Sequence, residues 1–192
     1  MRLEAPRDML KGFIYNMAVY CCVGAIICFT IQIIICRVKH RKYAFRRDFS
    51  ALLFVSYCVG LVSQTIPIYT ILRYGTLRMN GMYRSINLIP FNTIAEYVVQ
   101  GGSIAGISLA NVLGNILLFV PMGVLLPIVF QKCDKWCKTV LIGAAVSTTI
   151  ECVQYFFARS ADIDDVILNT LGTAVGFLIY KTFMRFEKTC NG

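Results

Sequence analysis

Residues 108–130 read SLANVLGNILLFVPMGVLLPIVF, and this stretch determines the class of fold. It contains no Asp, Glu, Lys, Arg or His over its whole length. A helix of roughly 20 apolar residues is long enough to cross the hydrocarbon core of a bilayer. The stretch therefore predicts a transmembrane helix. The glycines that precede it, at positions 101, 102 and 106, predict a loop.

Four further stretches are predicted to cross the membrane, at 12–36, 49–72, 139–158 and 164–181. The stretch at 139–158 reaches spanning length only if Glu151 lies inside the membrane. The chain of 192 residues is 57% hydrophobic and 15% charged, whereas soluble domains are about 25% charged. We therefore expect an all-α, polytopic transmembrane helical bundle of about five spans. It forms a single domain over residues 1–192 and carries an outer re-entrant or interfacial loop.

Basic residues predict the orientation of this bundle. The segment between the first two spans, RVKHRKYAFRRD at 37–48, carries six Lys or Arg residues. Short loops rich in these residues remain in the cytoplasm. We therefore expect a multi-pass protein of the cell (inner) membrane, with its N-terminus outside and its C-terminus cytoplasmic. The net charge of +9 then indicates loops that lie against anionic lipid, and not nucleic-acid binding.

Polar side chains inside three of the predicted helices lie at one depth. A charged group near the centre of a span costs about 2.5–3.5 kcal/mol, so such groups face the interior of a bundle and find partners there. Helical spacing places the members of each pair on one face of their helix. The pairs are Asn111 and Asn115, Glu151 and Gln154, and Asp165 and Asn169, and Ser147 shares the face of Glu151 and Gln154. Together they predict a polar pocket in the outer half of the membrane.

A run of acids begins the last helix. Asp162, Asp164 and Asp165 follow Arg159, which lies in the short connection before that helix. One acid at a helix start caps free N–H groups, and we expect this role for Asp162. Capping requires only one acid, so the three acids together could instead hold a divalent cation such as Mg²⁺ or Ca²⁺ through oxygen ligands. For Glu151 two interpretations stay open: a buried ion pair with Arg159 that joins two helices, and a functional role.

Two short motifs concern packing and the outer surface. The pair Gly172-x3-Gly176 predicts that the last helix approaches a neighbouring helix closely. The segment Asn87-Leu-Ile-Pro-Phe91 lies in the long loop before residue 108. Ile89 must be extended because a proline follows it. This segment is expected either to anchor the loop at the membrane interface or to fold back over the polar pocket.

Taken together and in this order, these stretches resemble the VanZ-like family. The resemblance is carried by Asn87 to Phe91, by NILLFVPMGVLLP at 115–127, by Glu151-x2-Gln154 and by R-x2-DIDD-x3-N-x2-G-x3-G at 159–176. It covers roughly the C-terminal half of the chain. It implies a small polytopic inner-membrane protein that faces the cell wall of Gram-positive bacteria. It also implies a link to resistance against glycopeptides and lipoglycopeptides of the teicoplanin type.

Three functions are compatible with these residues. The first is non-enzymatic binding of a membrane lipid, a lipid-linked cell-wall component or a lipoglycopeptide antibiotic. Its ligand-binding residues are expected to be Asn87, Asn111, Asn115, Gln154, Arg159, Asp162, Asp164 and Asn169. The second is a membrane-embedded enzyme acting on a lipid-linked phosphate or sugar, with Glu151 as the general base and Asp165 as a second catalytic residue. The third is a proton-coupled lipid flippase with Glu151 as the proton carrier. It ranks last because the sequence shows no inverted repeat.

Overall fold

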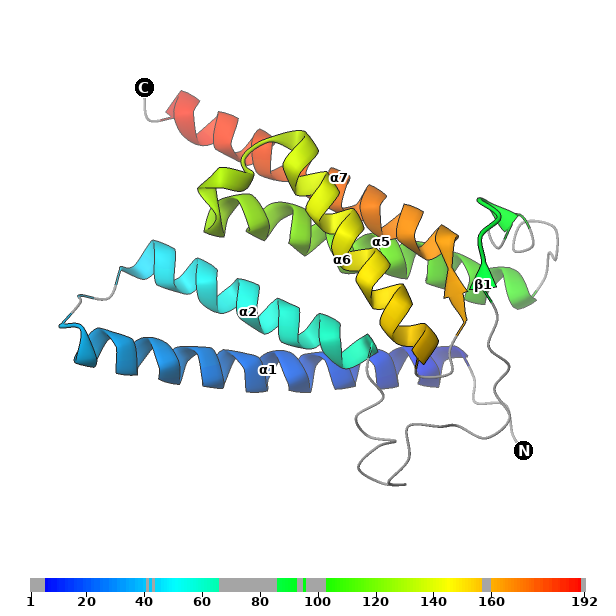
Figure 1. Ribbon diagram of the computed structural model, residues 1–192, viewed down its shortest axis with the longest axis horizontal. Helices are drawn as coiled ribbons and strands as arrows, with labels where there is room; N and C mark the ends of the chain where they lie inside the picture. The colour runs from blue at the N-terminus through cyan, green and yellow to red at the C-terminus, as the bar shows by residue number, and fades with distance from the viewer. Residues whose placement is uncertain are drawn as a thin grey trace. The chain divides into compact units, whose positions relative to one another are not determined.

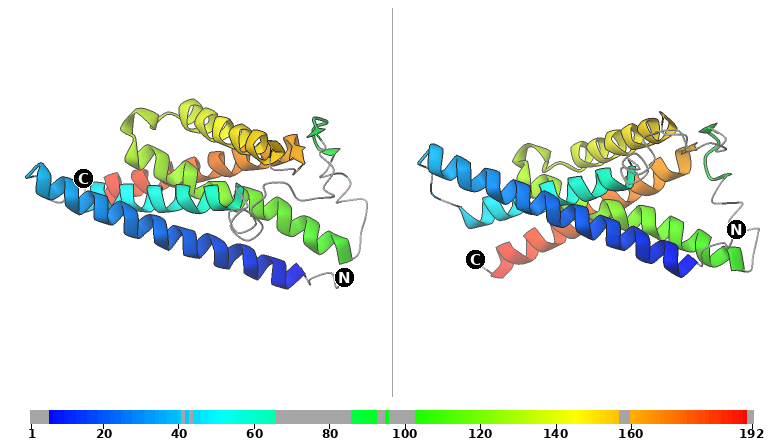
Figure 2. Two further views of the ribbon diagram at one scale, coloured as in Figure 1. Left: turned by 60° about the horizontal axis from the view of Figure 1, so that its bottom comes forward. Right: turned by 90° about the horizontal axis from the view of Figure 1, so that it is seen from below.

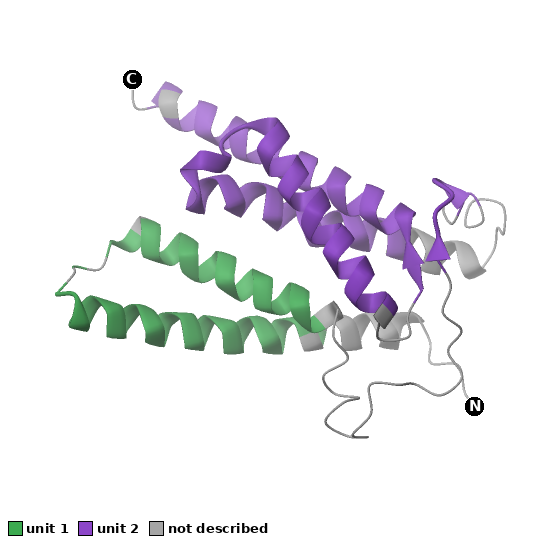
Figure 3. Ribbon diagram, in the orientation of Figure 1, with its two compact units in different colours: residues 1–75 green, residues 76–192 purple. Residues whose placement is uncertain are grey.

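The computed structural model describes residues 6–40, 42, 44–65, 86–92, 95, 103–156 and 160–190. Within these residues five α-helices account for nearly all regular structure, together with one short 3-10 helix and one pair of two-residue strands (Figure 1). The predicted all-α helical bundle is confirmed. The chain forms two compact units, residues 1–75 and residues 76–192, which Figure 3 distinguishes by colour.

Unit 1 is a hairpin of two helices, α1 (Pro6–Val38) and α2 (Phe45–Thr65). A short turn reverses the chain between them, so the helices run antiparallel (Figure 2). Gly24 of α1 packs against Val59, and Gly60 of α2 packs against Cys21. The helix predicted at 12–36 is therefore present and extends beyond both predicted ends. The last part of the helix predicted at 49–72 lies outside the described residues.

Unit 2 contains three long helices, α5 (Ser103–Val129), α6 (Trp136–Phe156) and α7 (Ile163–Cys190). The 3-10 helix η1 (Gln131–Cys133) joins α5 to α6. The predicted helices at 108–130, 139–158 and 164–181 correspond to these three. The loop predicted at Gly106 is wrong, because α5 already begins at Ser103 and Gly106 lies inside it. Because α7 continues to Cys190, it extends well beyond the apolar run that predicted it. Lys and Arg are good helix formers, so the basic residues after Tyr180 do not end the helix.

Glycine allows α7 to lie directly against α5. A Cβ atom at Gly172 would overlap the carbonyl oxygen of Ile116, and one at Gly176 would overlap the carbonyl oxygen of Val120. On α5, a Cβ atom at Gly123 would overlap the carbonyl oxygen of Thr173. The two backbones are thus in contact, as small residues at helix interfaces in membranes permit. The close approach predicted from Gly172-x3-Gly176 is confirmed.

Four of the described helical segments are long and apolar enough to cross a membrane: Met17–Val38, Asn111–Val129, Trp136–Tyr155 and Ile163–Glu187. The described part of α2 is not among them. Three of the four belong to unit 2, where side chains such as Phe119 and Phe177 form the buried core. The number of spans and their orientation in the membrane stay predictions.

Candidate functional site

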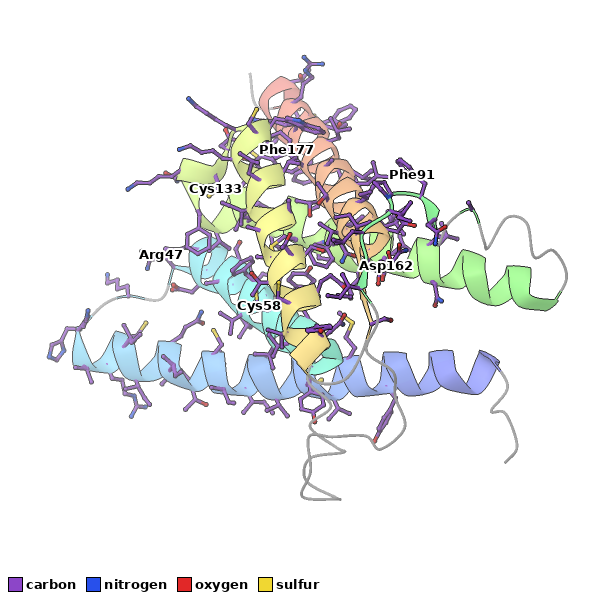
Figure 4. The ribbon with its side chains drawn as sticks, turned by 45° about the vertical axis from the view of Figure 1, so that its right-hand side comes forward. Arg47, Cys58, Phe91, Cys133, Asp162 and Phe177 are labelled. Atoms are coloured by element: carbon purple, nitrogen blue, oxygen red, sulfur yellow. The ribbon has the colours of Figure 1, made fainter. Side chains whose placement is uncertain are left out.

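The polar residues of unit 2 gather at the end where α5 and α7 begin and α6 ends. Here strand β1 (Ile86–Asn87) pairs in parallel with strand β2 (Ala161–Asp162), with Ile86 opposite Ala161 and Asn87 opposite Asp162. Figure 4 labels Phe91 and Asp162 in this region, whereas Cys133 lies at the other end of α6. The strand pair joins the loop before α5 to the start of α7.

Asp162 caps the first turn of α7 and also holds β1. Its Oδ1 atom accepts a hydrogen bond from the backbone N–H of Asp164 at 2.9 Å. The same oxygen accepts one from the side-chain amide of Asn87 at 3.2 Å. A carboxylate at this position satisfies an N–H group that the helix leaves free. The predicted capping role of Asp162 is confirmed, and the contact with Asn87 adds a connection across the chain.

Asp164 fastens the turn that follows β1. Its side chain is almost completely buried, with 1% exposure, and its Oδ1 atom accepts a hydrogen bond from the backbone N–H of Phe91 at 2.5 Å. Phe91 has a φ angle of 64°, which lies in the left-handed region that residues other than glycine rarely adopt. The backbone N–H of Ile89 in turn donates to Oδ1 of Asn87 at 3.2 Å. The loop of residues 86–92 is therefore held by side chains in a defined shape.

Glu151 connects α6 to the same structure. The residue is buried, and its Oε2 atom accepts a hydrogen bond from the backbone N–H of Asp162 at 3.1 Å. Its carboxylate thus satisfies a backbone donor on β2. The proposed ion pair with Arg159 falls outside the described residues, because Arg159 is not among them.

Two further hydrogen bonds join the helices below this level. The side-chain amide of Asn115 on α5 donates to Oδ1 of Asp165 on α7 at 2.5 Å. The amide of Asn169 on α7 donates to the hydroxyl of Ser147 on α6 at 2.9 Å. The other amide atom of Asn169, Oδ1, is buried and has no hydrogen-bond partner within the described residues. Leaving such an acceptor unsatisfied costs about 1–3 kcal/mol.

The structure therefore brings most of the predicted residues together, which confirms that polar groups of three helices meet at one end of unit 2. We call this set the polar cluster: Asn87, Asn115, Ser147, Glu151, Asp162, Asp164, Asp165 and Asn169. Asn111 is exposed and Gln154 is half-buried, and neither makes a side-chain hydrogen bond to another described residue. Whether any of these residues binds a ligand or acts in catalysis stays a prediction.

The described residues contain no group of three His, Cys, Asp or Glu side chains arranged to hold a metal ion. The three acids that could have formed such a set point to different partners. Asp162 caps α7, Asp164 binds the backbone at Phe91, and Asp165 accepts from Asn115.

Two features of the site were missed from the sequence. The strand pair could not be predicted, because strands of two residues show no periodicity. The bond from Phe91 to Asp164 involves a backbone N–H, which has no sequence signal. Ser147 was expected on the polar face of α6, because it lies four residues before Glu151, and it does bond to Asn169.

The outer surface of the 86–92 loop is apolar. Leu88 is 72% exposed and Ile89 is 66% exposed, and Ile86 and Phe91 are also exposed. Large apolar side chains that are exposed together mark sites of contact with a membrane, a ligand or another protein. The exposed apolar face of this loop is therefore available for such a contact.

Comparison with known proteins identifies the region that carries this site. The family model described as VanZ/LLP1 matches residues 49–185, which include the whole polar cluster. The chain is 32% identical over 111 residues to a protein of Enterococcus faecium named "Protein VanZ". That match covers 57% of this chain and 61% of the relative, so it spans less than two thirds of the relative's length. No solved structure matches.

Proposed function

The chain belongs to the VanZ/LLP1 family, and from this premise we propose that it binds a lipid-linked or lipophilic ligand at the polar cluster and the 86–92 loop. We further propose that this binding contributes to resistance against glycopeptides of the teicoplanin type. The ligand would be a lipid-anchored component of the cell envelope or the antibiotic itself. Under the predicted orientation the site faces the outside of the cell.

The observation that carries the proposal is the apolar face of a loop that hydrogen bonds hold in place. Asp164 and Asp162 fix the loop through Phe91 and Asn87. The exposed side chains Leu88 and Ile89 are therefore presented without the entropy cost of ordering a flexible segment. Removing a side chain of this size from water contributes about 1.5–3 kcal/mol. An acyl chain or the hydrocarbon boundary of the bilayer would supply that environment.

The polar cluster supports a ligand with a polar head group next to its lipid part. Asp162, Asp165 and Asn87 are half-buried and can be reached from the surface, whereas Glu151, Asp164 and Asn169 are buried. Carboxylate and amide oxygens accept hydrogen bonds from hydroxyl, amide and ammonium groups. A head group rich in such donors therefore fits the accessible acceptors.

Binding measurements on the full chain in lipid nanodiscs test this proposal. The variant Leu88→Asn/Ile89→Asn removes the apolar face, and we expect it to weaken binding of a fluorescent teicoplanin by at least tenfold. A glycopeptide without an acyl chain should bind both forms equally weakly. The control variant Val38→Asn/Phe130→Asn changes two exposed apolar residues elsewhere and should bind as the wild type does. Equal binding of teicoplanin by the loop variant would refute the proposed site.

A further inference from the structure

We propose that unit 1 contains a second, separate site, which binds an anionic phospholipid where α1 ends and α2 begins. This site lies within residues 29–52, and it uses none of the residues assigned above to the polar cluster. It therefore adds a lipid partner that the proposed function does not require.

A groove of about 730 Å³ runs between the two helices at this end. Phe29, Ile33 and Cys36 line it from α1, and Phe45, Phe49 and Leu52 line it from α2. The rings of Phe45 and Phe49 stack with 5.3 Å between their centroids and form one wall. The volume lies within the range of roughly 300–1,000 Å³ that is usual for small-molecule sites. The lining suits a hydrocarbon chain.

One cationic side chain, Arg37, completes the lining. Arg37 is exposed and forms no ion pair with any other residue that the structure describes. It lies in the last turn of α1, directly after the apolar part of the groove. Its guanidinium group presents a rigid fork of donors that matches the geometry of a phosphate.

The sequence that connects α1 to α2 is strongly basic, and this favours an anionic head group. Six Lys or Arg residues lie between positions 37 and 47. Asp48, the next acid along the chain, is buried, and its carboxylate accepts hydrogen bonds from the backbone N–H of Ala44 and from Arg47. Figure 4 labels Arg47 at the start of α2. Clusters of four to eight basic residues next to a transmembrane helix are typical of sites for anionic lipids.

The order of these features along α1 distinguishes a phospholipid from a soluble anion. The part of the apolar lining that α1 contributes lies within the segment Met17–Val38, which is long and apolar enough to cross a membrane, and Arg37 lies next to the end of that segment. A phospholipid has the same order, with its chain in the hydrocarbon and its phosphate at the boundary. A soluble anion would use Arg37 but leave the apolar groove empty.

Native mass spectrometry of the full chain with dioctanoyl phosphatidylglycerol tests this site, with dioctanoyl phosphatidylcholine as the comparison lipid. We expect phosphatidylglycerol to bind more tightly, and Arg37→Gln to weaken it by about fivefold or more. Lys138→Gln, which removes one charge from an exposed residue of α6, should leave its affinity unchanged. An equal loss in Lys138→Gln, or no loss in Arg37→Gln, would overturn the proposal.

A second variant tests the apolar part of the site. Leu52→Trp places a larger side chain in the groove, and we expect it to weaken both lipids. If phosphatidylglycerol still binds Leu52→Trp with wild-type affinity, the charged loop acts without the groove and the proposal fails. Thermal unfolding of each variant shows that it is folded, and unchanged teicoplanin binding shows that the site in unit 2 is intact.

Discussion

The two units bury polar side chains for different purposes. In unit 2, polar cluster residues join segments that are far apart in the chain: Asn87 with Asp162, Phe91 with Asp164, and Asn115 with Asp165. In unit 1, the buried carboxylate of Asp48 bonds to residues within four positions of itself. One buried side-chain bond there joins the two helices, from the amide of Gln32 to the backbone oxygen of Asp48. Among the described residues, unit 2 therefore has several side-chain bonds between distant segments where unit 1 has this one, and unit 2 is the part of the chain built around a fixed site.

The two units also differ in how closely their glycines bring the helices together. In unit 2, Gly172 and Gly176 bring one backbone against another. In unit 1, a Cβ atom added at Gly24 would meet the side chain of Val59 first, and it would lie 3.3 Å from the Cα of Ser56. A side chain can rotate away from an added methyl group more easily than a helix can move. The packing of unit 2 is therefore the less tolerant of the two.

The largest expected effect tests this tolerance. Gly176→Val should destabilise the protein by about 3 kcal/mol, because the new side chain meets the carbonyl oxygen of Val120 and cannot be accommodated without moving α7. Gly24→Ala in unit 1 should cost about 1 kcal/mol. Chemical unfolding in detergent micelles, followed by circular dichroism, measures both. Equal costs for the two variants would remove the contrast between the units.

The next effect concerns the buried acids. Asp164→Ala should cost about 2 kcal/mol, because it removes an almost fully buried side chain and leaves the backbone N–H of Phe91 without its acceptor. Asp48→Ala should cost about 1 kcal/mol, because the bonds that it loses are local ones, to the N–H of Ala44 and to the exposed side chain of Arg47. The same unfolding measurement compares them. A larger loss in Asp48→Ala would show that the local bonds of unit 1 are the more important ones.

A smaller effect separates binding from catalysis at Glu151. Glu151→Gln keeps an oxygen that can accept the bond from the backbone N–H of Asp162, so stability should change by less than about 1 kcal/mol. Under the binding proposal, teicoplanin affinity and resistance should also be retained. An enzyme that uses Glu151 as a base, or a proton-coupled flippase, would lose activity in this variant. Loss of resistance with retained stability and binding would favour one of those alternatives.

The smallest effect concerns the far end of unit 2. Lys181 pairs with Asp134 at 2.7 Å, and both side chains are almost half exposed. Exposed ion pairs contribute about 0.2–1 kcal/mol and are screened by salt. Lys181→Met should therefore change stability by less than about 0.5 kcal/mol, and raising the salt concentration should reduce that difference further. A cost as large as that of Asp164→Ala would mean that the polar contacts that matter are not confined to one end of unit 2.

The helices could be predicted from the sequence because apolar length alone identifies them. Their ends were predicted less well: α7 continues past Tyr180 and α1 begins at Pro6, since charged residues end an apolar run without ending a helix. The spacing of residues such as Asn115 and Asp165 also predicted correctly which faces meet.

The loop at the site could not be predicted in the same way. Its position depends on a two-residue strand pair and on the backbone N–H of Phe91, which bonds to a residue 73 positions away. Neither feature leaves a local pattern in the sequence. The apolar character of Leu88 and Ile89 was visible, but not that hydrogen bonds hold them beside the polar cluster.

A double-mutant cycle between Asn87 and Asp162 tests most directly whether the 86–92 loop is fastened to the start of α7. The cycle compares the unfolding free energies of Asn87→Ala, Asp162→Ala and the double variant, so the loss of capping by Asp162 cancels. Their hydrogen bond predicts a coupling energy of about 1 kcal/mol. If the losses of unfolding free energy in the two single variants add up to that of the double variant within about 0.3–0.5 kcal/mol, the contact is contradicted, because residues without contact behave additively.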